Sequence, residues 1–346
     1  MYSHLRDATL AFFSWRFVEK PFRRKGGVVS GRTLFGISFV LTSSFIALGA
    51  HGILSDGWPQ RLPKDVVSII TEQGRLQAAK YCPSLSASDI GAGNVCQLGS
   101  SQSIPPSFVV WGDSHANALT PAFDALATKT NTHGWMVRML GCPPLMGVWP
   151  TKPPKSNACS DFNDSVMTQI ENHKPEFVVL VARWSAYSSG WPKGGLEENA
   201  PQPFLSDSQT SGDTMENSRE VFERGLRLTF LRLQKIGTKV FVVEQVPEFK
   251  YPVPESLARL KMLAVPIETH EPTLDEYRRR QEFFSKQLDQ FSLQYSFTRI
   301  NLSEVLCMNG RCQLEHQDHP LYRDDNHLSN YGAFFVSPSL LPIFER

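Results

Sequence analysis

The chain has 346 residues, of which 41% are hydrophobic and 20% are charged, and its formal net charge at pH 7 is +1. This length and hydrophobic content are sufficient for one large α/β core. The near-neutral charge gives no electrostatic reason for nucleic acid binding, and we expect no nucleic acid partner.

The N-terminal part predicts a membrane anchor. Residues 34–54 form an apolar run without Asp, Glu, Lys or Arg, and at about 1.5 Å per residue a helix of this length crosses a bilayer core of about 30 Å. The alternative is a buried core helix, because the run contains Ser, Thr and His. A cleavable signal peptide fits less well, since the run starts late and lacks a small-x-small cleavage site.

The flanks of residues 34–54 predict the orientation of the anchor. The upstream flank is strongly basic, with Arg16, Lys20, Arg23, Arg24, Lys25 and Arg32. The downstream flank is poorer in Lys and Arg, which places the N-terminal side in the cytoplasm and the residues after Asp56 outside it.

Two further segments follow the apolar run. Residues 55–106 contain Ser, Gly and Pro with one helical stretch, 64–81, and we expect them to be an extension beside the next domain. From residue 107 onward, strand-like and helical patterns alternate, which is typical of a parallel sheet covered by helices on both faces. The predicted strands are 107–111, 135–140, 177–182, 239–244 and 296–300, and the predicted helices are 116–130, 162–173, 215–235 and 274–294.

The tetrapeptide Gly112-Asp113-Ser114-His115 follows the first of these strands. Open α/β sheets bind ligands at the C-terminal ends of their strands, so the Ser114 hydroxyl lies where a nucleophile would act. Taken alone, the tetrapeptide also fits an ordinary turn in which the serine caps a helix.

A second motif, Asp324-Asp325-Asn326-His327, lies near the C-terminus. An Asp three residues before a His can fold back, accept the Nδ1–H of the imidazole and leave Nε2 free to take a proton from a serine. Taken alone, this motif also fits a surface turn with a solvated histidine. Both motifs in one chain, in this order, favour a catalytic pair.

The two motifs resemble those of the SGNH hydrolases, also called the GDSL-like family, and the resemblance covers residues 107–346. It implies a three-layer α/β/α flavodoxin-like fold with a parallel sheet, preceded here by a transmembrane helix. It also implies Ser114 as nucleophile, His327 as general base and Asp324 as the residue that orients the base. Asp325 is the alternative orienting residue, although it departs from the family spacing.

The oxyanion hole of that family combines the N–H of the nucleophile, a glycine N–H and an asparagine side chain. By position, the first two are Ser114 and Gly141, although Gly141 also fits a plain turn before two prolines. At the asparagine position, the chain has Arg183. Either Arg183 supplies the missing donor or backbone amides suffice, and the sequence leaves both possibilities open.

The six cysteines form three sequence-local pairs, Cys82–Cys96, Cys142–Cys159 and Cys307–Cys312. Six cysteines allow fifteen pairings, so the local one is an inference. An even number with short loops is typical of an oxidising compartment. A zinc set drawn from Cys307, Cys312, His316 and His319 is the competitor, but its spacing matches no common finger and the Met-Asn-Gly-Arg insert fits a disulfide-closed hairpin. We therefore expect no metal.

Two predicted loops, 143–157 and 184–211, interrupt the alternation of strands and helices. They carry Trp149, Tyr187 and Trp191 among polar residues, a combination that suits sugar rings. They are either the walls of an acceptor groove or plain surface excursions.

A second resemblance covers the N-terminus. The segment Ser14–Arg24, SWRFVEKPFRR, resembles the cytoplasmic end of the membrane domain of acyltransferase-3 proteins, many of which continue into one further transmembrane helix and a periplasmic SGNH domain. In that subset the asparagine block is degenerate and a Gly-Cys-Pro-Pro-like segment is present, as here. The resemblance implies residues 1–33 as the end of the membrane domain, 34–54 as a transmembrane helix, 55–106 as a periplasmic extension and 107–346 as the SGNH domain.

This resemblance also implies a function and a location. The chain would be a periplasmic O-acyltransferase, with acetyl as the expected group, anchored by a single span in a bacterial inner membrane. Its partners would be the acyltransferase-3 membrane domain, fused or separate, and a cell-envelope polysaccharide acceptor. Acetyl-CoA would be the ultimate acyl donor through the membrane domain, and the SGNH domain itself would bind no cofactor. A carbohydrate O-acetylesterase and a non-catalytic glycan-binding module are the alternatives.

Overall fold

The computed structural model describes residues 12–20, 30–55, 57–75, 82–100, 105–151 and 157–345. The chain divides into two units, Met1–Leu62 and Pro63–Arg346.

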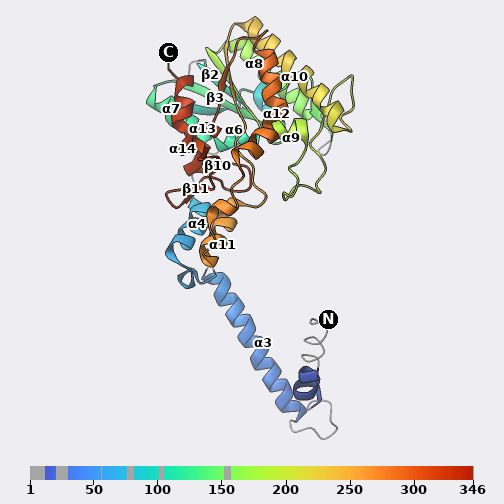
Figure 1. Ribbon diagram of the computed structural model, residues 1–346, viewed down its shortest axis with the longest axis vertical. Coiled ribbons are helices and arrows are strands. Elements are labelled where there is room, and N and C mark those ends of the chain that lie inside the picture. The colour runs from blue at the N-terminus through green and yellow to red at the C-terminus, as the bar shows by residue number, and fades with distance from the viewer. Residues whose placement is uncertain are drawn as a thin grey trace. The chain divides into compact units, whose positions relative to one another are not determined.

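The first unit is helical where it is described. It contains a short π-helix, η1 (Ser14–Glu19), the long helix α3 (Gly31–Leu54) and a 3-10 turn, η2 (Pro59–Arg61) (Figure 1). The hydroxyl of Ser30 caps α3 by accepting a hydrogen bond from the N–H of Thr33 at 3.2 Å. Within the described ranges, α3 is the one helix long and apolar enough to cross a membrane. It begins three residues before the predicted span of 34–54 and ends at the same residue, and residues 21–24 of the N-terminal motif lie outside the described residues.

The second unit is built on a six-stranded sheet in the order β1-β3-β2-β5-β7-β8. Its strands are β1 (Cys96–Gly99), β2 (Phe108–Gly112), β3 (His133–Arg138), β5 (Phe177–Val181), β7 (Lys239–Val243) and β8 (Thr298–Ile300). The last five pair in parallel with one another, which confirms the predicted parallel sheet. The edge strand β1 pairs antiparallel to β3. It falls in the segment that we expected to be an extension, because its four residues, CQLG, carry no strand-like alternation.

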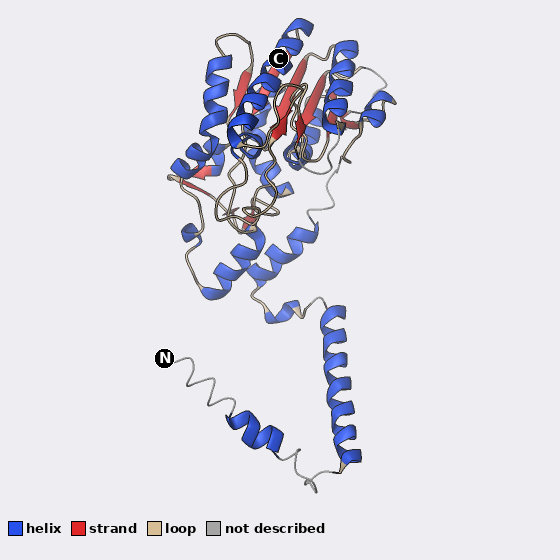
Figure 2. Cartoon of the chain, turned by 90° about the vertical axis from the view of Figure 1, so that its right-hand side faces the viewer, coloured by secondary structure: helices blue, strands red, loops and turns tan. Residues whose placement is uncertain are grey.

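Helices cover both faces of this sheet (Figure 2). On one face, α7 (Thr120–Lys129) and α14 (Asn330–Leu340) pack with Phe108 and Val110 of β2. On the other face, α8 (Ala158–His173), α10 (Met215–Ile236) and α12 (Leu274–Phe291) pack with Val109 and Trp111. Successive side chains of a strand point to opposite faces, and every residue of β2 is buried, so the strand contributes to both cores. The α/β/α architecture is therefore confirmed.

Shorter elements connect this framework. The helices are α4 (Lys64–Arg75), α5 (Ala87–Gly91), α6 (Ser114–Ala118), α9 (Trp184–Ser189), α11 (Val253–Leu263) and α13 (Ser303–Leu306), with 3-10 turns η4 (Ile267–Thr269) and η5 (Leu341–Ile343). Helix α4 packs against α11. The predicted helix 64–81 is confirmed as far as Arg75, and residues 76–81 lie outside the described residues. The predicted helix 116–130 is wrong at its start, since helical structure begins at Ser114 and breaks at Leu119.

Three two-residue ladders complete the fold. They pair β4 (Trp149–Pro150) with β6 (Leu205–Ser206), β9 (Cys307–Met308) with β10 (Arg311–Cys312), and β11 (Glu315–His316) with β12 (His319–Pro320). The first ladder joins the two segments that we expected to be loops. In the second, Asn309 and Gly310 have φ angles of 53° and 78°, as a tight hairpin turn requires.

The structure contains the three expected disulfides, Cys82–Cys96, Cys142–Cys159 and Cys307–Cys312. The zinc alternative fails at its cysteines, because Cys307 and Cys312 bond to each other. Its two histidines lie against aromatic rings, His316 beside Phe335 and His319 beside Tyr331. Over the ranges that the structure describes, no group of three or more His, Cys, Asp or Glu residues is arranged to hold a metal ion.

Candidate active site

The Ser114 hydroxyl lies at the junction between strand β2 and helix α6. The strand ends at Gly112, the helix begins at Ser114, and Asp113 caps the helix by accepting the N–H of His115 at 2.8 Å. A Cβ at Gly112 would lie 1.9 Å from the carbonyl oxygen of Val181 on the neighbouring strand, so only glycine fits there. This turn holds the hydroxyl at the C-terminal edge of the parallel sheet, where the sequence predicts it.

The structure brings Ser114, His327 and Asp324 into one hydrogen-bonded series. Nε2 of His327 lies 2.7 Å from Oγ of Ser114, and its Nδ1 lies 2.8 Å from Oδ2 of Asp324. Because a carboxylate only accepts hydrogen bonds, Nδ1 carries the imidazole proton and Nε2 accepts the serine hydroxyl. This is the arrangement in which a histidine can take the serine proton as it attacks.

The loop that carries His327 is shaped by the carboxylate of Asp324. Its Oδ1 accepts the backbone N–H groups of Asn326 at 2.9 Å and of His327 at 2.7 Å, so both oxygens are engaged. Burial acts to raise the pKa of Asp324, but the hydrogen bond and charge of His327 and the two backbone N–H groups hold that pKa well below its usual value. The alternative orienting residue, Asp325, is buried and accepts the side-chain amide of Asn326 at 3.0 Å. The structure therefore assigns the contact with His327 to Asp324.

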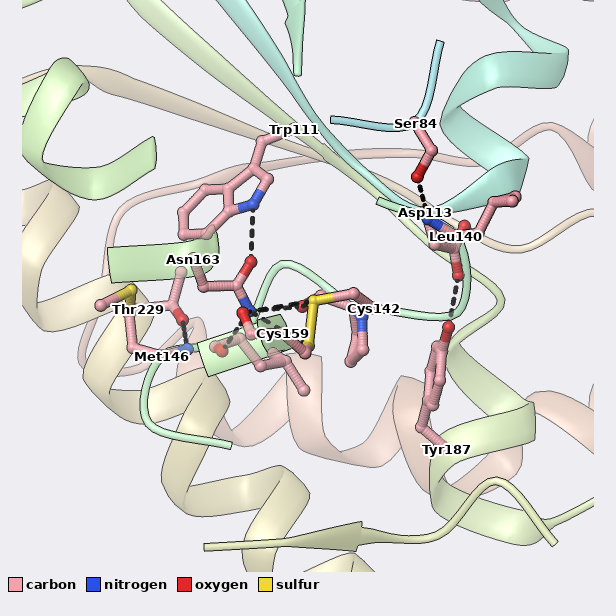
Figure 3. The surroundings of a disulfide bond; sticks show 12 residues. Ser84, Trp111, Asp113, Leu140, Cys142, Met146, Cys159, Asn163, Tyr187 and Thr229 are labelled. Atoms are coloured by element: carbon pink, nitrogen blue, oxygen red, sulfur yellow. Dashed lines mark hydrogen bonds between the residues drawn. A yellow bond between two sulfur atoms is a disulfide. The ribbon is translucent and has the colours of Figure 1, made fainter. Parts of the chain in front are cut away.

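A second carboxylate, that of Asp113, holds the turn between β2 and Ser114 in place through hydrogen bonds to another segment. Its Oδ2 accepts the N–H of Arg183 at 3.0 Å and the hydroxyl of Tyr187 at 2.8 Å; Figure 3 shows the second bond. Burial raises the pKa of Asp113, and these hydrogen bonds with that of His115 partly offset the rise. Since Tyr187 and Trp184 are buried, this part of the predicted loop 184–211 belongs to the interior and cannot line an acceptor groove.

A buried histidine links the two motif loops. Nε2 of His115 lies 3.1 Å from Oδ1 of Asn326, and the rings of His115 and His327 have centroids 4.6 Å apart. Burial lowers the pKa of His115 well below the usual value of a histidine, 6.5, with the charge of His327 adding to the effect. His115 is therefore neutral, and since Oδ1 of Asn326 accepts, its Nε2 carries the proton.

Two of the expected oxyanion donors lie at turns on the same sheet edge. The N–H of Ser114 belongs to the first residue of α6, where no intrahelical acceptor exists. Gly141 lies in an exposed turn after β3 with a φ of +64°. The next residue, Cys142, is tied to α8 by its disulfide with Cys159.

Asn163 of α8 holds the segment after Gly141 in place. Its Nδ2 donates to the carbonyl oxygens of Pro143 at 2.9 Å and Leu145 at 2.8 Å, and its Oδ1 accepts the indole N–H of Trp111 at 3.0 Å. Figure 3 shows this arrangement around the Cys142–Cys159 disulfide. The turn is thus fixed to β2, the strand that leads into the turn of Ser114.

The guanidinium of Arg183, the third expected donor, is largely engaged elsewhere. Its Nε pairs with Glu248 at 2.6 Å, its Nη1 pairs with Glu197 at 2.5 Å, and its Cζ lies 4.9 Å from the centre of the Trp191 ring. Burial acts to lower the pKa of Arg183, but the two carboxylates raise it overall. Its Nη2 is buried without a hydrogen-bond partner among the described residues. The backbone N–H of Arg183 is also committed, to Asp113.

Comparison with known proteins identifies the family. The family model described as "SGNH domain (fused to AT3 domains)" matches residues 81–342. The chain belongs to this family. The match begins upstream of β1 and so includes the antiparallel edge strand in the SGNH domain. By this description, SGNH domains of the family are fused to acyltransferase-3 (AT3) domains, which supports the resemblance of the N-terminal motif to the end of such a domain. No curated protein matches the chain.

Several solved structures are similar to the chain, and the first of them agrees with it on the fold. The periplasmic domain of a Salmonella ser. Paratyphi A lipopolysaccharide acetyltransferase is 16% identical, with 82% of this chain and 98% of that chain covered at a TM-score of 0.55. A GDSL-like lipase from Bacteroides thetaiotaomicron is 10% identical, with 75% and 94% covered at a TM-score of 0.39. An acetyl xylan esterase is 14% identical, with 68% and 98% covered at a TM-score of 0.37. Family membership and the hydrogen-bonded serine together support an acyl-modifying SGNH enzyme.

Proposed function

We propose that this protein is an O-acyltransferase that transfers an acetyl group to a hydroxyl of a cell-envelope polysaccharide such as O-antigen or capsule. The observation that carries the proposal is the hydrogen-bonded series Ser114–His327–Asp324 at the sheet edge of a domain whose family is fused to AT3 domains. The apolar helix α3 would anchor the domain at the membrane, with the SGNH domain in the periplasm.

The chemistry follows from the geometry. Oγ of Ser114 attacks the carbonyl carbon of the acyl donor while Nε2 of His327 takes its proton, and the leaving group departs with that proton to leave an ester on Ser114. A sugar hydroxyl then gives its proton to Nε2 and attacks the ester carbonyl. Collapse of the second intermediate releases the acetylated sugar and returns the proton to Ser114. Asp324 fixes the tautomer and stabilises the imidazolium that forms in each half.

The acyl group has to reach Ser114 from elsewhere. In our proposal the AT3 membrane domain, fused or separate, delivers it from cytosolic acetyl-CoA, and the SGNH domain needs no resident cofactor. The N–H groups of Ser114 and Gly141 would receive the oxyanion, since the Arg183 guanidinium is held by Glu248 and Glu197.

An O-acetylesterase is the second candidate, because water can take the place of the sugar hydroxyl in the second half-reaction. The side chains of His327 and Asp324 are 17% and 37% exposed, so water reaches the site in the absence of an acceptor. A non-catalytic glycan-binding module explains less, since it requires neither the hydroxyl–imidazole contact nor the buried supports around it.

The experiment that separates the candidates uses the full chain in detergent micelles with an aryl acetate donor. A transferase exposed to bulk water has to favour the sugar by positioning it and by excluding water. Adding the de-O-acetylated envelope polysaccharide should therefore speed donor consumption and yield acetylated sugar, detected by NMR. Fast release of acetate that no glycan changes, together with removal of acetyl groups from native polysaccharide, would establish the esterase. Failure of Ser114 to react with a fluorophosphonate probe would argue against both enzymes.

A further inference from the structure

A cleft of about 660 Å³ lies beside the candidate active site, and neither Ser114 nor His327 lines it. Its walls come from Lys193, the 247–251 segment, the 269–273 segment, Arg280 of α12 and Arg311 of β10. This volume is within the range of about 300–1,000 Å³ that is typical of ligand sites. We call it the side cleft.

The wall of the side cleft is bonded directly to the loop that carries the catalytic base. The N–H of Phe249 donates to the carbonyl oxygen of Asp325 at 2.7 Å, and the N–H of Val253 donates to that of Asp324 at 3.2 Å. The 247–253 segment therefore runs alongside the Asp324–His327 turn. A ligand held against this segment is therefore separated from the Asp324–His327 turn by one strand of backbone.

A buried carboxylate connects the cleft to the nucleophile turn. Glu248, whose side chain is 4% exposed, pairs through Oε1 with Arg183 at 2.6 Å and through Oε2 with Arg280 at 2.7 Å. Burial acts to raise the pKa of Glu248, but the two arginines lower it to about 2. Since the N–H of Arg183 is bound to Asp113, the residue before Ser114, one bonded framework supports the cleft and the nucleophile.

The chemistry of the side cleft suits a carbohydrate. Tyr251 is 55% exposed and lines the cleft, so it offers an aromatic face on which the apolar face of a sugar ring can stack. The stem of Lys250 runs along the 193–195 segment, with its Cε 3.7 Å from the Cβ position of Gly194. Lys193 and Lys250 line the cleft, and their ammonium groups can donate hydrogen bonds to hydroxyl groups. Glu276 lies on the same lining, where its Oε2 accepts the N–H and hydroxyl of Thr273, so Oε1 is the acceptor oxygen that it offers to a ligand.

We propose that the side cleft is the acceptor site, where a segment of polysaccharide binds with one ring stacked on Tyr251 and its hydroxyls bonded to Lys250. This inference rests on the proposed transferase function. The acyl donor enters elsewhere, so the cleft governs the second half-reaction and not the acylation of Ser114.

The test compares acceptor dependence between variants of the full chain in detergent micelles. The acyl donor is 4-nitrophenyl acetate. The acceptor is the de-O-acetylated envelope polysaccharide of the bacterium that makes this protein. Tyr251→Ala should raise the acceptor concentration for half-maximal transfer about tenfold, and Lys250→Ala about threefold. Tyr251→Phe should behave as wild type, because the stacking face is kept. Lys129→Ala, an exposed lysine of α7 outside the cleft, is the matched control and should leave all activities unchanged.

The outcomes separate the two proposals. If the wild type transfers acetyl to the polysaccharide and Tyr251→Ala has the same half-saturating concentration, the side cleft is not the acceptor site. If Tyr251→Ala instead slows acylation measured without acceptor, the cleft serves the donor and the inference is wrong. If the wild type hydrolyses the donor but acetylates no glycan, the transferase function itself fails, and the acceptor inference fails with it. Thermal melts of each variant show whether the fold is retained.

Discussion

Replacing Asp324 by asparagine tests the catalytic series most directly. In the native site, one oxygen accepts two backbone N–H groups and the other accepts Nδ1–H of His327. An amide has one acceptor oxygen and one NH₂ donor. If the oxygen keeps the backbone contacts, the NH₂ faces Nδ1 and forces the imidazole proton to Nε2, where it can no longer accept the Ser114 hydroxyl.

The expected loss is about 10⁴-fold in turnover, the size seen when the orienting carboxylate of a serine protease triad is made an amide. This corresponds to about 5.5 kcal/mol of transition-state stabilisation. Asp325→Asn is the matched control. Its Oδ1 contacts only the side-chain amide of Asn326, so we expect a loss smaller than tenfold.

The assay is hydrolysis of an aryl acetate by the full chain in detergent micelles, with single-turnover acylation of Ser114 followed by mass spectrometry. Both variants should retain the wild-type melting temperature within a few degrees, so that the rates report chemistry. A smaller loss for Asp324→Asn than for Asp325→Asn would refute the tautomer argument and assign the orienting role to Asp325.

Three further outcomes follow from the same geometry. Ser114→Ala should abolish fluorophosphonate labelling and acetyl transfer with an unchanged melting temperature; residual labelling would identify a different nucleophile. Gly112→Ala should lower the free energy of unfolding by at least about 1–3 kcal/mol, because the new Cβ meets the carbonyl oxygen of Val181. Thermal denaturation measures this loss. His115 is neutral in the fold and its pKa is lowered below 6.5, so the unfolded chain binds more protons and stability should fall, by up to about 1.4 kcal/mol per pH unit, as pH drops below 6.5. His115→Gln should flatten that slope between pH 7 and 5, and an unchanged slope would assign it to other groups.

In this chain, a contact could be predicted from the sequence when its two residues are close together in the sequence. The contact between Asp324 and His327 is local, three residues apart, and a turn brings it about without help from the rest of the fold. Ser114 is recognisable because it lies two residues after the end of a continuous buried strand. The disulfides were predictable for the same reason, since all three pairs are close in sequence.

Interactions between segments that are far apart in the sequence could not be predicted from it. Glu248 is 65 residues from Arg183, and nothing in the sequence around either residue indicates that the two meet. The role of Tyr187 was misjudged in the same way. An aromatic residue in a polar, proline-rich stretch suggests a surface loop, whereas α9 packs against α10 and α12, and the hydroxyl of Tyr187 donates to Asp113. The edge strand β1 depends on pairing with β3 and not on its own pattern.

The loss of the family's asparagine is explained by what Arg183 does instead. A neutral amide at that position would donate to the oxyanion, but it could not neutralise Glu248, whose negative charge is buried. Arginine satisfies the carboxylate, and Arg280 does so from the cleft side. In the proposed mechanism, the site would thereby exchange one oxyanion donor, at a cost of about 3 kcal/mol in transition-state stabilisation, for a rigid wall between Ser114 and the side cleft. An enzyme that must deliver its acyl group to a sugar in the presence of water gains more from positioning the acceptor than from faster acylation, because each acyl-serine lost to water consumes a donor without product.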